Sequence, residues 1–164
     1  MCNRRISNQL GLGIQSNEAP SSLQKLLYYL KLKYRNPPVV IYENGELLYY
    51  KLKIRVGDKP DPSRRFVTDD EFRTHYLQGY IEATLLSIRN GSNVQGYFVW
   101  SFMDVFELLF AYRFRFGLYG VDFGAEEKRR YPRHSAQWYA SFLHGSELRP
   151  ATPTLSRIRA YSER

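Results

Sequence analysis

The sequence has 164 residues and little of several residue types that carry chemistry elsewhere. Its one cysteine, Cys2, excludes an internal disulfide bond and a metal cluster held by several thiolates. Its histidines are few, and His134 and His144, at the two ends of the last expected helix, lack ligand spacing. We therefore expect no metal site and no other cofactor.

Long apolar runs are also missing. No stretch approaches the ~18 consecutive apolar residues that a membrane-spanning helix needs, so we expect no membrane partner. The basic start, residues 1–5, is not followed by the apolar segment of a signal peptide. The sequence leaves the localisation open.

Positive charge is in excess: 24 Lys and Arg against 16 Asp and Glu give a formal net charge of +8. Such an excess can attract nucleic acid. The basic residues are scattered, however, and no block reaches the length of a basic arm. Because no binding motif accompanies the charge, we expect no nucleic-acid partner and keep that class only as the weakest alternative.

Aromatic residues are abundant at 16%, and hydrophobic residues make up 43% of the chain. That content is enough for a packed core, so disorder of the whole chain is not expected. Aromatic rings also stack on flat ligands such as sugars.

Hydrophobic spacing predicts an alternation of helices and strands. The expected helices cover residues 20–35, 68–89 and 132–143, and the expected strands cover residues 39–41 and 94–101. This order is typical of parallel strands joined by a helical crossover, which places the chain in the α/β class. Parallel strands need neighbours and two covered faces, so two of them indicate part of a larger α/β protein.

Details of the expected elements follow from local signals. Thr68 and Glu71 form a capping box at the start of the second helix. The buried stripe expected for that helix consists of Leu77, Ile81, Leu85 and Ile88. The apolar face expected for the first helix consists of Leu23, Leu26, Leu27, Leu30 and Tyr34. Residues 1–19 are expected to be a loop or loose tail, 47–56 a hairpin, 102–131 a long aromatic loop region, and 146–164 a polar, basic tail.

One short stretch directly after the first expected strand combines a carboxylate with a turn signal: Tyr42-Glu43-Asn44-Gly45. In barrels of parallel strands the carboxyl ends of strands carry the chemistry. A glutamate there can act as a nucleophile, a general base or a metal ligand. The alternative is a solvated residue beside an ordinary Asn-Gly turn. These four residues alone leave both interpretations open.

A second stretch changes that balance. The segment 39–45 reads Val-Val-Ile-Tyr-Glu-Asn-Gly. The second stretch, 96–101, reads Gly-Tyr-Phe-Val-Trp-Ser. After it come Asp104, Phe106-Glu107 and Arg115-Phe116-Gly117-Leu118. Together they resemble glycoside hydrolase family 1, the plant-type β-glucosidases in particular, over residues 22–145. The resemblance covers the last third of such an enzyme and implies a partial (β/α)8 TIM barrel made of its last strands and helices.

The resemblance also implies roles for four residues. Glu43 would be the catalytic nucleophile of a retaining hydrolysis of β-glucosides. Trp100 and Phe116 would contact the sugar, and Glu107 would accept hydrogen bonds from its hydroxyls. The alternatives are a core residue for Trp100, a surface acid for Glu107 and plain packing for Phe116.

Three departures from the family pattern qualify this expectation. No Asn-Glu-Pro, the motif that carries the family's acid/base, occurs in the sequence. Leu108 stands where the family commonly has a tryptophan, and Phe110-Ala111 replaces an acidic-plus-glycine pair. We therefore expect the chain to be inactive by itself. The alternative function is that of a non-catalytic truncated homologue that associates with full-length relatives.

Overall fold

The computed structural model describes residues 19–47, 67–108, 111–112 and 114–148. Its elements in chain order are α1 (Pro20–Lys33), β1 (Val39–Asn44), α3 (Glu71–Arg89), β2 (Val94–Val99), β3 (Tyr119–Val121), β4 (Arg130–Pro132) and α4 (His134–Leu143). The expected tails, apart from residues 19 and 146–148, and nearly all of the expected hairpin lie outside the described residues.

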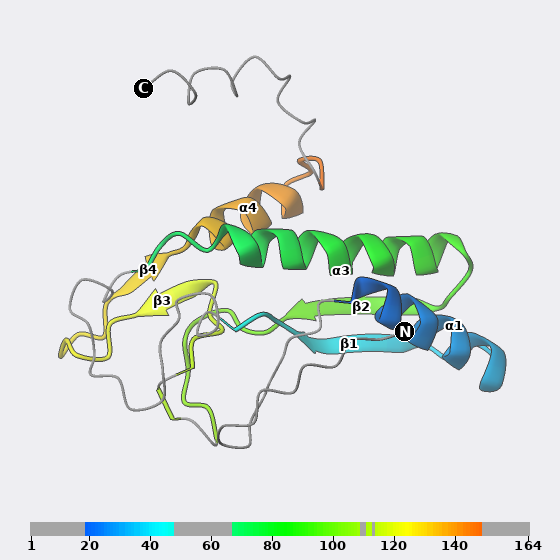
Figure 1. Cartoon of the computed structure of the whole chain (residues 1–164), viewed down its shortest axis with the longest axis horizontal. Helices are drawn as coiled ribbons and strands as arrows, with labels where there is room; N and C mark the ends of the chain where they lie inside the picture. Colours follow the sequence, from blue (N-terminus) through cyan, green and yellow to red (C-terminus); the bar gives the residue numbers. More distant parts are fainter. Residues whose placement is uncertain (1–18, 48–66, 109–110, 113, 149–164) are drawn as a thin grey trace, which may run out of the picture.

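Strands β1 and β2 pair in parallel, with Ile41 opposite Tyr97 and Asn44 opposite Val99. Helix α3 lies between them in the sequence and runs along the pair in Figure 1. A parallel pair requires such a crossover, because the chain must return to the end of the sheet at which the first strand began. The prediction of an α/β fold with parallel strands is confirmed.

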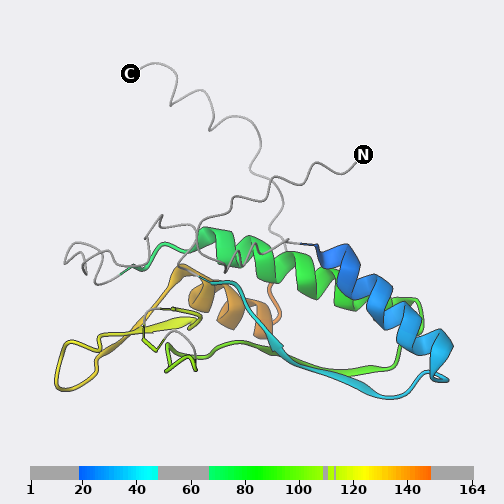
Figure 2. The same ribbon diagram turned by 60° about the horizontal axis from the view of Figure 1, so that its bottom comes forward.

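The core lies between this strand pair and the helices α3 and α4. It consists of Leu77, Ile81, Leu118 and Ala136, each at most 6% exposed. Tyr97 and Val99 of β2 pack against it, which is expected for alternate residues of a strand that face one layer. Helix α1 packs beside α3, so the helices cover one face of the strands, as Figure 2 shows.

The opposite face of the strand pair carries exposed apolar side chains. Tyr42 is 74% exposed and Phe98 is 56% exposed. Their rings stack with centroids 6.0 Å apart. Val40 adds to the same row of side chains on β1, because strand residues alternate between faces. No described helix covers this face, which is unusual for a parallel sheet.

The prediction of a capping box on the second helix is wrong. Helix α3 begins at Glu71, and its N-cap is Asp70. Thr68 lies outside the helix, where its carbonyl oxygen accepts a hydrogen bond from the His134 N–H at 2.8 Å. The Asp70 carboxylate makes no cap bond, because it is bound to Arg73 and Ser135 instead.

The predicted apolar stripes are only partly buried. Leu77 and Ile81 are buried in α3, but Leu85 is 36% and Ile88 is 43% exposed. In α1 only Leu27 is buried, while Leu26 is 52% exposed. A helical period identifies an apolar face but does not show whether another element covers it.

The described residues between 102 and 131 contain more regular structure than the sequence indicates. They contain β3 and the start of β4, which pair antiparallel with Tyr119 opposite Pro132. Helix α4 therefore begins at His134, because Pro132 belongs to a strand. The glycines expected to end the helices do so, since Gly91 and Gly145 have φ values of +83° and +94°. Among the described helices, none has the length and apolar character needed to span a membrane.

Candidate active site

Glu43 is the next-to-last residue of β1 and is exposed. From the pair Ile41–Tyr97 to the pair Asn44–Val99, β1 advances one residue more than β2. The extra residue makes a β-bulge that includes Tyr42 and Glu43. Bulges re-aim side chains and are frequent beside active sites.

Trp100 directly follows β2, and its N–H donates to the Asn44 carbonyl oxygen at 2.9 Å. Since the strands are parallel, Glu43 and Trp100 lie at the same carboxyl edge of the pair. The chain after β1 passes so close that a Cβ on Gly45 would lie 1.8 Å from the Trp100 carbonyl oxygen. Only glycine fits at this crossing, which gives the Asn-Gly sequence a structural reason beyond turn formation.

We expect Gly45→Ala to lower the free energy of unfolding by about 1–3 kcal/mol, because the methyl group forces the two backbones apart. Urea unfolding of the 164-residue chain measures this. The control is Gly96→Ala in the same strand pair, where the new Cβ meets a Val40 methyl at 3.1 Å. Equal costs for the two variants would contradict the proposed role of the crossing.

Trp100 and Glu107 contact each other through their side chains. The indole Nε1–H of Trp100 donates to Oε1 of Glu107 at 3.3 Å, and both residues are half-buried. The Glu107 backbone pairs in both directions with Ala111, at 2.9 and 2.7 Å. These bonds hold the Glu107 backbone in position, and its carboxylate accepts the bond from Trp100. The single indole N–H is used in this bond, so the remaining lone pairs of the Glu107 carboxylate are the acceptors for hydroxyl groups.

Phe116 is brought to the same region by backbone pairing. The Ser101 N–H donates to the Phe116 carbonyl oxygen at 3.2 Å, and the Leu118 N–H donates to the Ser101 carbonyl oxygen at 2.8 Å. Phe116 is half-buried beside the residue that follows Trp100. The residues predicted to bind sugar thus lie on one connected segment after β2.

The buried carboxylate of Asp104 stabilises that segment through hydrogen bonds and ion pairs. Asp104 is 2% exposed. Its carboxylate accepts two hydrogen bonds from Arg133, at 3.0 and 2.8 Å, and one from Arg115 at 3.1 Å. The backbone N–H groups of Gly117 and Val121 donate to it at 3.0 and 3.2 Å. Burial alone would raise the pKa of Asp104, but the hydrogen bonds and charges of the two arginines outweigh burial and lower it.

A second buried ion pair extends the support to β1. Arg73 of α3 is fully buried and donates to Asp70 at 2.6 Å. It also donates to the carbonyl oxygens of Glu46 at 3.1 Å and Gly117 at 2.9 Å. The Arg73 side chain therefore connects the segment that follows β1 with the segment that precedes β3. Burial lowers the pKa of Arg73 to about 10, although the nearby Asp70 charge acts in the opposite direction.

Sequence reasoning missed this buried network. The sequence analysis included Asp104 in the family motif but assigned no role to its side chain. A signal was present, because Asp104 is the one charged residue in a stretch of Phe, Met and Val from 102 to 106. A charge in such a stretch is rarely buried unless it is paired.

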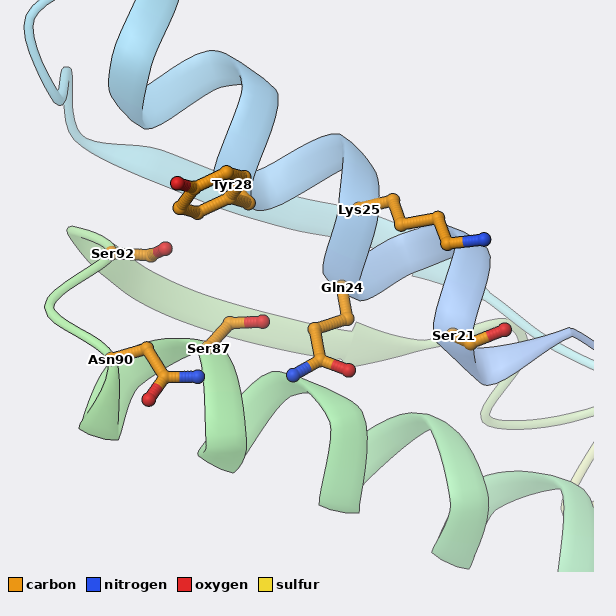
Figure 3. A pocket seen from close by; sticks show the side chains of 7 residues that line it. All are labelled: Ser21, Gln24, Lys25, Tyr28, Ser87, Asn90 and Ser92. Atoms are coloured by element: carbon orange, nitrogen blue, oxygen red, sulfur yellow. The ribbon is translucent and has the colours of Figure 1, made fainter.

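A separate cleft of about 220 Å³ lies between α1 and the end of α3 (Figure 3). It is lined by Ser21, Gln24, Lys25, Tyr28, Ser87, Asn90 and Ser92. Asn90 and Ser92 precede β2, so the cleft lies near the amino ends of the strands, away from Glu43. Across the part of the chain that the structure describes, no group of three or more His, Cys, Asp or Glu side chains could hold a metal ion.

Comparison with protein families matches the chain to the family described as Glycosyl hydrolase family 1, over residues 7–147. The chain is 44% identical over 128 residues to Beta-glucosidase 3 of Arabidopsis thaliana. It is also 44% identical over 128 residues to the Cyanidin 3-O-glucoside 5-O-glucosyltransferase (acyl-glucose) of Dianthus caryophyllus. The alignments cover 78% of this chain but only 23% and 24% of these relatives.

Solved structures agree. The Aphid myrosinase superposes with a TM-score of 0.65 at 30% identity, covering 84% of this chain and 26% of the myrosinase. The Beta-glucosidase from Thermotoga maritima in complex with glucoimidazole superposes with a TM-score of 0.63 at 30% identity, covering 76% and 26%. The chain therefore spans about a quarter of the length of the proteins that it matches.

Proposed function

Because this chain belongs to glycosyl hydrolase family 1, we propose that it supplies the part of a retaining β-glucosidase active site that carries the nucleophile. In this proposal Glu43 is the nucleophile. Trp100, Glu107 and Phe116 bind the sugar. The observation that carries the proposal is the placement of Glu43 and Trp100 at one carboxyl edge of the parallel pair, joined through the Asn44–Trp100 hydrogen bond.

The proposed reaction has two displacements. A Glu43 carboxylate oxygen forms a bond to the anomeric carbon while the bond to the aglycone oxygen breaks, and that oxygen leaves with the electron pair and takes a proton from a general acid. Water, deprotonated by the same general acid/base group, then forms a bond to the anomeric carbon while the ester bond to Glu43 breaks. The Glu43 carboxylate leaves with the electron pair, and glucose is released with retained configuration. A hydroxyl group in place of water would give transfer, the kind of reaction named for the Dianthus relative.

The general acid has to come from another polypeptide segment. Retaining enzymes place it about 5–5.5 Å from the nucleophile, and the sequence contains no Asn-Glu-Pro to carry it. Loss of a general acid typically lowers the rate 10²- to 10⁴-fold. We therefore propose that the 164-residue chain does not turn over β-glucosides by itself and acts together with the rest of a barrel.

The sugar-binding part of the proposal rests on hydrogen-bonding chemistry. Glu107, when ionised, accepts hydrogen bonds from sugar hydroxyls, and charge-assisted bonds of this kind are the stronger ones. The Trp100 contact at 3.3 Å holds the carboxylate in place. The indole face is suited to the apolar side of a sugar ring.

A barrel chimera tests the proposal. In it, residues 20–147 of this chain replace the matching segment of Beta-glucosidase 3 of Arabidopsis thaliana, to which the chain is 44% identical. We expect the folded chimera to hydrolyse an aryl β-glucoside, and the 164-residue chain alone to give no turnover. A chimera that is folded by circular dichroism and inert would overturn the proposal.

Leu108 offers a second test of the sugar pocket. It is 88% exposed next to Glu107, at the position where the resemblance places a tryptophan. We expect Leu108→Trp in the barrel chimera to lower KM for an aryl β-glucoside about 2- to 10-fold, the effect of one added hydrogen bond. Leu108→Phe is the control, because it adds a ring without an N–H donor. Equal KM values for the two variants would show that no such bond forms.

A second candidate function is non-catalytic association with full-length relatives. The exposed row of Tyr42 and Phe98 favours it, because contiguous apolar surface promotes contact with other proteins. Co-expression of the tagged 164-residue chain with Beta-glucosidase 3 tests this candidate. A stable co-purified complex supports it, and a folded monomer that does not bind the relative contradicts it.

A further inference from the structure

Asn44, the residue after Glu43, is held at two points, by Tyr97 of β2 and by Trp100, which directly follows β2. Its carbonyl oxygen accepts the Trp100 N–H at 2.9 Å. Its side-chain oxygen Oδ1 accepts the Tyr97 hydroxyl at 2.7 Å. The second bond joins a side chain of one strand to a side chain of the other, so it is not part of the regular strand pairing.

Tyr97 is itself fixed by the core. Its ring is half-buried and packs against the cluster of Leu77, Ile81, Leu118 and Ala136. Burial raises the pKa of Tyr97, so its hydroxyl stays protonated and remains a donor at physiological pH. The hydrogen bond to Asn44 therefore fixes the end of β1 relative to the core.

The bulge explains why β1 needs such a bond. Because Tyr42 and Glu43 lie in an irregularity of the pairing, the ladder alone does not fix the direction of the Glu43 side chain. The first firm point beyond the bulge is Asn44. A shift of Asn44 moves the Cα of the adjacent residue with it, since consecutive Cα atoms are joined by a planar peptide.

We propose that Tyr97 is a positioning residue, which acts through its hydrogen bond to Asn44 to aim the Glu43 carboxylate at the reacting carbon. This inference rests on the proposed function, in which Glu43 is the nucleophile. Tyr97 does not touch the substrate in this proposal. It sets the geometry of attack, and small misplacements of a reacting group can cost a factor of about 10² in rate.

The first experiment uses the 164-residue chain and needs no activity. Tyr97→Phe removes only the hydroxyl group. We expect the Trp100 amide to exchange its hydrogen about 5-fold faster by NMR, as one lost hydrogen bond would cause. The Val39 amide, bound to the Asn93 carbonyl oxygen at 2.9 Å at the other end of β1, serves as the internal reference and should not change.

The second experiment measures chemistry in the barrel chimera. We expect Tyr97→Phe to lower kcat for an aryl β-glucoside about 10- to 100-fold, with KM within about 2-fold of the unsubstituted chimera. The control is Tyr139→Phe. Tyr139 packs against the same core cluster from α4, so this variant removes a comparable hydroxyl without touching Asn44.

The outcomes separate this inference from the proposed function. The unsubstituted chimera reports on the function, and an inert chimera leaves the exchange experiment to decide whether the bond exists. Unchanged exchange at Trp100 would overturn the inference. So would a Tyr97→Phe chimera whose kcat equals that of Tyr139→Phe, or one whose loss lies entirely in KM.

Discussion

Glu43→Gln should lower kcat/KM of the barrel chimera for an aryl β-glucoside by about 10⁴-fold or more, because an amide cannot form the glycosyl ester. The substitution keeps the size of the side chain. Glu43 is exposed at the end of β1, so the folded state should not change measurably. The loss should appear in kcat, since the carboxylate is used only as the transition state forms.

Covalent trapping gives a direct measurement. A 2-deoxy-2-fluoro-β-glucoside with a good leaving group slows the second displacement more than the first, so the glycosyl ester accumulates. We expect mass spectrometry of the unsubstituted chimera to show one added fluorodeoxyglucosyl group, on the peptide that contains Glu43. The Glu43→Gln chimera should stay unlabelled.

Glu126→Gln is the matched control, because Glu126 is also exposed but lies between β3 and β4. It should keep full activity and full labelling. A label on any other carboxylate, or activity that survives Glu43→Gln, would remove Glu43 from the role of nucleophile. The chimera would still report whether the chain supports hydrolysis at all.

The parallel strand pair could be predicted from the sequence because its signals are local. A β-branched run at Val39–Ile41 and an aromatic run at Val94–Val99 flank a helix that ends at Arg89, just before Gly91 with its positive φ. With a helix between them, two strands of one sheet pair in parallel. The common edge of Glu43 and Trp100 follows from that topology, and the structure places both residues there.

The buried charges could not be predicted in the same way. The bond from Arg133 to Asp104 spans 29 residues, and the bond from Arg73 to Gly117 spans 44. No periodic pattern connects residues so far apart. The same interactions explain the missed cap, since Asp70 lies at the start of α3 but binds Ser135, 65 residues away. Short strands such as β3 carry too few residues to show an alternation.

The ionic network underlies the second large effect that we expect. Asp104→Asn should lower the free energy of unfolding of the 164-residue chain by about 3–5 kcal/mol, because it leaves a buried arginine without its counter-charge. The side chain of Arg133 is 1% exposed and that of Asp104 is 0% exposed, so water cannot replace the lost partner. Urea unfolding followed by circular dichroism gives the value.

The exposed pair Arg129–Glu127 provides the control within the same chain. Its side chains are 75% and 70% exposed, and its atoms are 3.7 Å apart. Glu127→Gln should change stability by less than about 1 kcal/mol, as is usual for surface ion pairs. Equal effects of Asp104→Asn and Glu127→Gln would show that the buried network contributes no more than a surface pair.

The pH dependence of stability gives the same network an independent test. The hydrogen bonds and charges of Arg133 and Arg115 overcome the effect of burial and hold the pKa of Asp104 below its ordinary value of 3.8. A lowered pKa in the folded state means that this carboxylate stabilises the chain above pH 3.8, and that the stabilisation is lost as the pH falls through the lowered pKa. Asn cannot be protonated in this range, so the unfolding free energy of Asp104→Asn should fall less steeply with acid than that of the unsubstituted chain. Parallel acid curves for the two proteins would mean that Asp104 does not titrate with a lowered pKa, and the network would then lose its place as the support beneath Trp100 and Phe116.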